Sequence, residues 1–102
     1  MIIYNVTIKV DWTSADKWLQ WMKNTHIPEV IATGCFEKHQ LVRLLEIDET
    51  EGPTYAVQYY ALSIKNYNEY LQQYAPDLKQ KSIEKWGENF IAFRSLMQIE
   101  NY

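Results

Sequence analysis

Apolar and polar side chains alternate from the start of the chain, in the stretch "IIYNVTIKV" at residues 2–10. A period of two built from β-branched and aromatic residues predicts a strand with one apolar face. The same kind of pattern predicts further strands over residues 35–47, 54–62 and 89–99. Towards the end of the 35–47 stretch both faces are largely apolar, which predicts that both faces are covered.

Between the first two predicted strands, apolar residues recur at spacings of three and four, which indicates a helix over residues 13–26. Pro28 lacks an N–H group and disfavours helical geometry at Ile27, so we expect a kink there and a second short helix over residues 28–33. The large side chains of the first helix share one broad arc: Trp18, Leu19, Trp21, Met22 and His26.

A second helical region is predicted over residues 63–87, between the third and fourth strands. Pro76 is expected to interrupt it, because proline removes a helix hydrogen bond. The apolar side chains at spacings of three and four predict a buried face, formed by Ile64, Tyr67, Tyr70, Leu71 and Tyr74.

Residues suited to helix ends support both helical predictions. Thr13 or Ser14 can cap the first helix and Ser63 the second, because a hydroxyl accepts a hydrogen bond from a free backbone N–H. Gly34 and Gly87 follow the two helical regions, where glycine allows the chain to leave the helix.

The predicted order of elements is β-α-β-β-α-β, within a single domain over residues 1–102. This order is that of the ferredoxin-like α+β fold, in which two right-handed crossovers place both helices on one face of a four-stranded antiparallel sheet. The other face would be left bare although it carries apolar residues. We therefore expect a homodimer in which a second copy covers the sheet face.

Composition narrows the classes of protein to which the chain can belong. Of the residues, 47% are hydrophobic and 15% aromatic, which is ample for a packed core. The net charge is −3 and arginine occurs only at Arg43 and Arg94, so we predict no binding of nucleic acid. With one cysteine, no apolar run of membrane-spanning length and no signal-peptide pattern, we expect a soluble cytoplasmic protein that does not bind a membrane.

Several stretches resemble a small bacterial family known only as a domain of unknown function. They are "MIIYNVTIKVDW", "WLQWMKNTHIPEVIATGCF", "PTYAVQYY", "YAPDLKQK" and "KWGENFIAFRSLMQ". The resemblance covers nearly the whole chain and implies membership of the dimeric α/β-barrel superfamily. That superfamily contains cofactor-independent monooxygenases, isomerases, cyclases, haem-linked enzymes and ligand-binding modules, so the resemblance does not select an activity.

His26 is the candidate catalytic residue. Its place on the apolar arc of the first helix would direct it into the space between helix and sheet, where it could act as a general base or orient a polar ligand. The alternative is a core histidine that is hydrogen-bonded to a backbone carbonyl or a tyrosine and holds the kink before Pro28.

The candidate ligand-binding residues are Trp18, Trp21, Met22, Arg43, Tyr59 and Arg94. The aromatic members could line a pocket for a planar ligand, or they could form core and dimer interface. The two arginines lie within strands among apolar neighbours, where each requires an anion. That anion could be a ligand carboxylate, or it could be Glu29, Glu46 or an acidic residue of a partner copy.

The remaining chemistry-bearing residues have simpler interpretations. His39 is expected to be solvated, and Cys35 to be a small buried thiol. Two histidines on different elements without a supporting carboxylate pattern form a weak metal signal, so we predict neither a metal site nor a cofactor. Residues 46–52, "EIDETEG", lack the spacing of a calcium loop and are interpreted as a solvated turn.

Three hypotheses about function follow. The first is a small-molecule-binding homodimeric module without established activity. The second is a cofactor-independent enzyme, similar to a monooxygenase or an isomerase, that acts on a small aromatic or anionic substrate with His26 as base. The third is a protein-interaction domain that uses the bare sheet face or the sheet edges.

Overall fold

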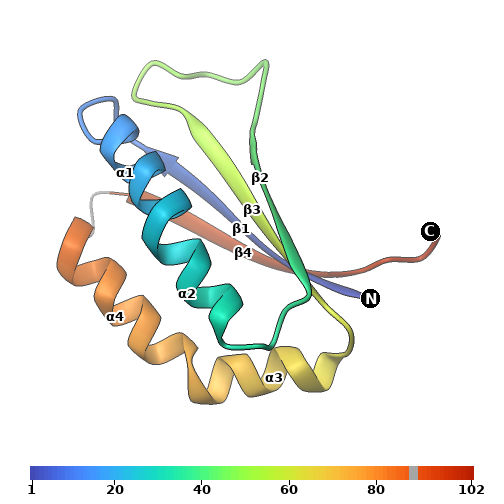
Figure 1. The fold of residues 1–102 in the computed structure, drawn as a ribbon. Coiled ribbons are helices and arrows are strands. Elements are labelled where there is room, and N and C mark those ends of the chain that lie inside the picture. The colour runs from blue at the N-terminus through green and yellow to red at the C-terminus, as the bar shows by residue number, and fades with distance from the viewer. Residues whose placement is uncertain (88–89) are drawn as a thin grey trace.

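The computed structural model describes residues 1–87 and 90–102, which form an antiparallel sheet with helices on one side (Figure 1). The sheet has four strands in the order β2-β3-β1-β4, so the first strand lies at its centre between β3 and β4. The strands are β1 (Ile2–Val10), β2 (Lys38–Arg43), β3 (Thr54–Ala61) and β4 (Phe90–Gln98). The predicted ferredoxin-like α+β fold is thereby confirmed, although Asn89, the first residue of the predicted fourth strand, lies outside the described residues.

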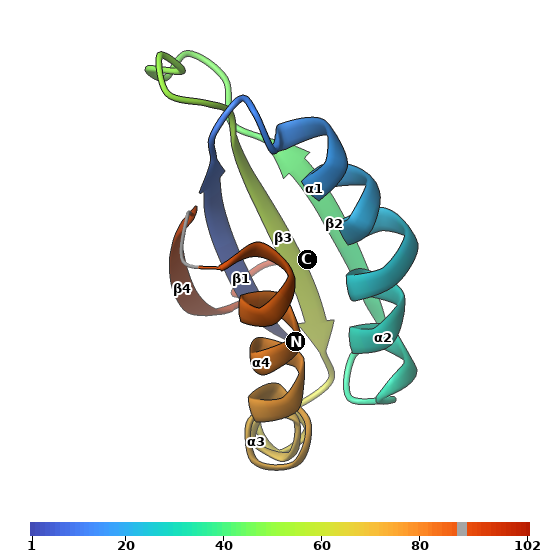
Figure 2. The same cartoon turned by 90° about the vertical axis from the view of Figure 1, so that its left-hand side faces the viewer.

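The helices form two arms that cover one face of the sheet (Figures 1 and 2). The first arm is continuous and consists of α1 (Ala15–Trp21), the π-helical segment η1 (Met22–His26) and α2 (Ile27–Ala32). The second arm consists of α3 (Ile64–Gln73) and α4 (Ala75–Trp86), which meet at an angle next to Pro76. The prediction that the helices share one face of the sheet is confirmed.

The π-helical segment corrects the prediction of non-helical geometry before the proline. Ile27 is helical, with φ −60° and ψ −45°, and its N–H donates to the carbonyl of Met22, five residues back. In a regular α-helix the ring of Pro28 would meet the carbonyl of Asn24, four residues back. One wide turn relieves this conflict without ending the helix.

The helix ends agree with the sequence in part. Ser63 Oγ accepts a hydrogen bond from Asn66 N at 3.3 Å, as predicted, and Gly87 ends α4 with φ +68°. At the first helix, however, the Ser14 side chain caps nothing. The Asp11 carboxylate organises the turn just before this helix, where it accepts hydrogen bonds from Ser14 N at 3.1 Å and from the Thr13 hydroxyl at 2.6 Å.

The core lies between the helices and the inward face of the central strands. On the face of β1 that the alternation predicted to be apolar, Tyr4, Val6, Ile8 and Val10 are buried there and Ile2 is half-buried. The predicted buried face of the second helical region is only partly correct, because Tyr70 is buried while Ile64 and Leu71 are exposed. The α3 helix crosses the end of the sheet (Figure 1), so only the side bearing Tyr70 meets the core, where its ring packs edge-on against Phe36 at 5.0 Å.

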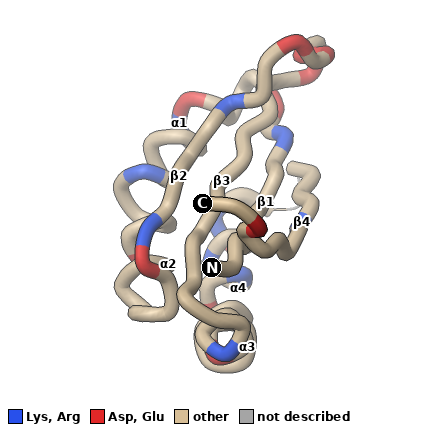
Figure 3. The backbone as a smooth tube through the Cα atoms, turned by 90° about the vertical axis from the view of Figure 1, so that its right-hand side faces the viewer, with Lys and Arg blue, Asp and Glu red and all other residues tan. Residues whose placement is uncertain are grey.

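Strand β2 is an edge strand, and most of its residues are exposed in the single chain. The prediction that both of its faces are covered is therefore wrong for the chain by itself. The strand ends at Arg43, and residues 44–53 form a long loop in which acidic residues gather (Figure 3). Hydrogen bonds from Val10 N to Pro53 O (3.1 Å) and from Trp12 N to Glu51 O (3.2 Å) fix this loop to the end of β1.

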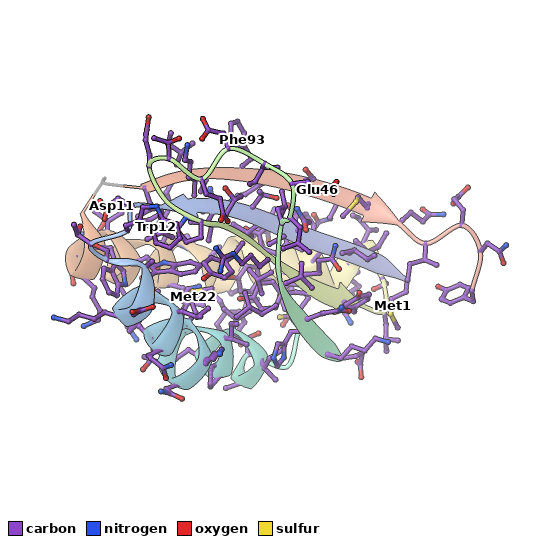
Figure 4. The ribbon with its side chains drawn as sticks, turned by 90° about the horizontal axis from the view of Figure 1, so that it is seen from above. Met1, Asp11, Trp12, Met22, Glu46 and Phe93 are labelled. Atoms are coloured by element: carbon purple, nitrogen blue, oxygen red, sulfur yellow. The ribbon has the colours of Figure 1, made fainter. Side chains whose placement is uncertain are left out.

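The sheet face opposite the helices carries exposed apolar side chains of β4. Phe93 is 68% exposed and Ile91 is 58% exposed, and Figure 4 shows Phe93 on the side of the sheet away from Met22 and the helices. Among the described residues, no helix combines the length and the apolar character needed to cross a membrane.

Candidate functional site

A cavity of about 660 Å³ lies between the two helical arms and the sheet. Its floor comes from β1, β3 and β4, and its walls come from α1 and η1 on one side and from α3 and α4 on the other. Six of the residues predicted from the sequence line it: Trp18, Trp21, Met22, His26, Tyr59 and Arg94. The volume is within the range of clefts that bind small molecules.

Trp18 and Met22 belong both to the hydrophobic core and to the lining of the cavity. Each is only 2% exposed, and the Trp18 ring packs against Tyr55 of β3 with ring centroids 5.5 Å apart. Figure 4 shows that Met22 points from the helix towards the sheet. These two side chains therefore serve as core and as cavity wall at once, which combines the two roles that the sequence left open.

His26 is half-buried on the cavity wall, where its ring stacks on Trp21 with centroids 4.9 Å apart and an angle of 23° between the planes. Burial lowers the pKa of the imidazole; Glu29 opposes this effect and Arg94 adds to it. The ring makes no hydrogen bond to another described residue, so the predicted alternative of a histidine tied to a carbonyl or a tyrosine does not hold. Stacking on Trp21 is what orients it, and at neutral pH it is an uncharged base.

Arg94 brings a positive charge to the same cavity from β4. Its Nε donates to the hydroxyl of Tyr4 at 3.1 Å, which fixes the guanidinium against this buried residue of β1. The residue lines the cavity and is also exposed to solvent. Lys79 of α4 also lines the cavity and is exposed, and no acidic residue among residues 1–87 and 90–102 lines it.

Arg43, the other strand-borne arginine, lies away from the cavity. It forms a two-pronged ion pair with Glu49 of the long loop, at 2.9 and 3.1 Å, and lies over the Trp12 ring at 5.9 Å. This acidic partner is neither of the two glutamates that the sequence suggested. The reason is that the chain turns back after β2 and brings the loop over the edge strand.

Two residues that line the cavity each carry a buried polar atom without a hydrogen-bond partner among the described residues. These atoms are the hydroxyl of Tyr59 and the indole Nε1 of Trp86. Burial raises the pKa of Tyr59, and the neighbouring hydroxyls of Tyr70 and Tyr4 add to the rise, so the hydroxyl keeps its proton.

Sequence reasoning did not place Trp86 or Tyr4 at the site, although both line the cavity. The pattern held a weak signal for Trp86, because this residue continues the apolar side of its helix. Tyr70, whose aromatic ring on the apolar face of its helix could serve core or pocket, also lines the cavity. Of the other candidates, His39 is exposed and Cys35 is buried. Within the described parts of the chain, no group of three or more His, Cys, Asp or Glu residues is placed to hold a metal ion.

The fold is similar to that of several solved structures. SnoaB, a cofactor-independent oxygenase from Streptomyces nogalater, matches with a TM-score of 0.70 and 11% identity over 99% of this chain and 95% of its own. An ethyl tert-butyl ether d (EthD) family protein from Bacillus halodurans matches with a TM-score of 0.70 and 9% identity over 97% and 100%. A dimeric ferredoxin-like protein from an uncultured marine organism matches with a TM-score of 0.66 and 11% identity over 99% and 96%. At these identities the likeness shows the fold alone.

The sequence itself is matched by a family model and by no curated protein. The model covers residues 1–100 and confirms the resemblance to a domain of unknown function. The chain therefore belongs to the family described as Domain of unknown function (DUF4286).

Proposed function

We propose that the protein is a small-molecule-binding module whose cavity takes a planar, largely apolar ligand with an anionic group. The observation that carries the proposal is the composition of the cavity. Its described lining is dominated by aromatic and aliphatic side chains, and its formal charges are positive, from Arg94 and Lys79. An apolar cavity with a few polar groups is typical of sites that bind small organic molecules.

Arg94 is the residue proposed to hold the anion. Its Nε is engaged by Tyr4, whereas the two terminal nitrogens make no hydrogen bond to a described residue. A guanidinium held on one side in this way can bind a carboxylate with its remaining donors.

Paired ligands and paired arginine variants test the proposal by calorimetric titration. Naphthoic acid supplies a planar apolar body with a carboxylate, and naphthamide is its uncharged counterpart. We expect the wild-type protein to prefer the acid, and Arg94→Met to remove the preference. Arg43→Met is the matched control, because Arg43 also lies in a strand but not at the cavity. An unchanged preference in Arg94→Met would contradict the role of Arg94, and absence of binding of both ligands would contradict the proposal itself.

Proton abstraction by His26 is a second candidate function. It is supported by an uncharged imidazole on the cavity wall and by the fold shared with SnoaB, which is described as a cofactor-independent oxygenase. A bound ligand with an acidic C–H group should exchange that hydrogen for deuterium faster than in buffer, and His26→Gln should lose the acceleration. Equal exchange rates for wild type and His26→Gln would exclude His26 as the base, while His39→Gln controls for surface imidazole.

We also propose that two copies associate through the sheet face opposite the helices. The exposed Phe93 and Ile91 support this arrangement, and one protein of the same fold is described as dimeric. Light scattering should give the dimer mass for the wild type and the monomer mass for Phe93→Lys. Leu45→Lys, at a leucine of the loop that is 78% exposed, should leave the dimer intact. A monomeric wild type, or a different protein that binds this face in competition with the second copy, would favour the interaction-domain hypothesis.

A further inference from the structure

The hydroxyl of Tyr59 is a polar group for which no described residue provides a partner. Tyr59 is 2% exposed, and its ring is packed against Tyr4 at 6.0 Å and Phe36 at 5.3 Å, so the position of the hydroxyl is fixed. The residue lines the cavity, and no described residue forms a hydrogen bond with its oxygen. Buried polar groups in folded proteins nearly always have partners, so this exception requires an explanation.

A second buried polar atom without a described partner, on the wall formed by α3 and α4, points to the same explanation. Trp86, near the end of α4, also lines the cavity, and its buried indole N–H has no acceptor among the described residues. Its ring meets Trp21 edge-on at 5.9 Å, which holds the indole in place between the two helical arms. An indole nitrogen can only donate, so what satisfies it must supply an acceptor.

We propose that the natural ligand is an oxygenated aromatic acid, whose ring hydroxyl or carbonyl oxygens accept hydrogen bonds from Tyr59 and Trp86 while its acid group lies at Arg94. This inference rests on the proposed function, because it assigns the ligand class of the same cavity. Tyr59 and Trp86 would then be specificity-determining residues that separate oxygenated from unsubstituted rings.

The energetics favour such selectivity. A hydrogen bond formed on binding normally replaces one to water, which makes its net contribution small. The Tyr59 hydroxyl and the Trp86 N–H are buried before the ligand arrives, so little hydration is lost when a ligand oxygen reaches them. An oxygen that satisfies one of them should therefore strengthen binding by about tenfold or more.

A panel of hydroxynaphthoic acids, with the hydroxyl at different ring positions, tests the inference against naphthoic acid. Calorimetric titration of the wild-type protein should show at least one isomer that binds about tenfold more tightly than the unsubstituted acid. If naphthoic acid binds and every hydroxylated isomer binds equally or more weakly, this inference is overturned while the proposed function stands. If neither kind of acid binds, the proposed function fails first.

Tyr59→Phe removes the orphan hydroxyl and nothing else. We expect this variant to bind naphthoic acid as the wild type does and to lose most of the gain for the preferred hydroxylated isomer. We also expect it to melt no lower than the wild type, because it removes a buried group that has no partner among the described residues. Tyr55→Phe is the matched control on the same face of the same strand, since Tyr55 does not line the cavity. A gain that persists in Tyr59→Phe, or a Tyr59→Phe protein that is markedly less stable, would count against the inference.

The indole proton of Trp86 gives a readout that does not depend on a stable Tyr59 variant. In an NMR titration of the wild-type protein, with the resonance assigned by comparison with Trp86→Phe, this proton should move downfield when the preferred hydroxynaphthoic acid binds. Naphthoic acid should produce a clearly smaller shift. Equal shifts with the two acids would show that the ring oxygen does not reach Trp86, and would overturn its part in the inference.

Discussion

Replacing Ala92 by leucine fills the cavity from its floor and tests whether ligand and core compete for the same space. Ala92 is half-buried in β4, pairs with Ile8 of the central strand and lines the cavity. The substitution adds three carbon atoms without changing charge. If the cavity lies above Ala92 as the structure shows, these atoms enter existing space rather than displace neighbours.

The expected gain follows from the apolar surface that the new side chain buries. Burial of a CH₂ group contributes about 0.8 kcal/mol, so three carbons set an upper limit of about 2.4 kcal/mol. Because Ala92 is only half-buried, we expect about 1–2 kcal/mol. In a domain of this size each kcal/mol raises the melting temperature by roughly 4–8 °C.

Ala61→Leu is the matched control, since Ala61 is fully buried in β3 and does not line the cavity. There the added carbons have no space, and overpacking should destabilise the protein by about 1–3 kcal/mol. Thermal unfolding and calorimetric titration with naphthoic acid give the two readouts. Ala92→Leu should unfold at a higher temperature and lose binding. Destabilisation as large as that of Ala61→Leu would refute the cavity, and unchanged affinity in a stabilised Ala92→Leu would show that the ligand binds elsewhere.

Three further predictions concern stability. Gly52→Ala should lower the free energy of unfolding in urea by about 2–4 kcal/mol, because its Cβ would lie 1.8 Å from the carbonyl oxygen of Val10 and force apart the contact between β1 and the long loop. A loss of less than about 1 kcal/mol would show that the loop shifts freely. Ser63→Ala should cost about 1 kcal/mol by removing the cap of α3, and equal stability would show that the hydroxyl does not cap in solution. Because the pKa of His26 is lowered in the folded state, the imidazole takes up a proton in the unfolded state first as the pH falls below 6.5. The free energy of unfolding of the wild type should therefore decline below this pH, by up to about 1.4 kcal/mol per pH unit, until the pKa of the folded state is passed. His26→Gln should lack this part of the decline, which His39→Gln should keep, and parallel curves for wild type and His26→Gln would contradict the lowered pKa.

The order of elements, and which side chains of each strand share a face, could be predicted because the alternation along a strand depends only on the residues of that strand. In β1 and β4 an alternating pattern fixes which side chains share a face, and the two strands pair along their whole length with Val6 opposite Arg94. A helix pattern shows only that one side is apolar, not what that side meets. This is why Ile64 and Leu71 were predicted to be buried and are exposed, whereas Tyr70 meets the core.

The two arginines show where the sequence is insufficient for the site. Arg43 and Arg94 both lie in strands among apolar neighbours, so local pattern does not distinguish them. Arg43 pairs with Glu49 because β2 is an edge strand and the acidic loop of residues 44–53 lies beside it. Arg94 lines the cavity because the inward face of β4 borders the space between the helices. Neither the partner of an edge strand nor an empty volume between elements is encoded in any short stretch of residues.

The π turn before Pro28 decides what His26 can do. In an uninterrupted α-helix His26 would follow Met22 by four residues and fall on the same buried line. The wide turn inserts one residue, which in an α-helix corresponds to about 100° of rotation, so Ile27 takes the buried position instead and is 3% exposed. His26 is thereby moved aside to the cavity wall, where it is half-buried and stacked on Trp21. The proline that was expected to kink the helix therefore leaves the imidazole of His26 available to a ligand, whereas a regular α-helix would pack this ring into the core.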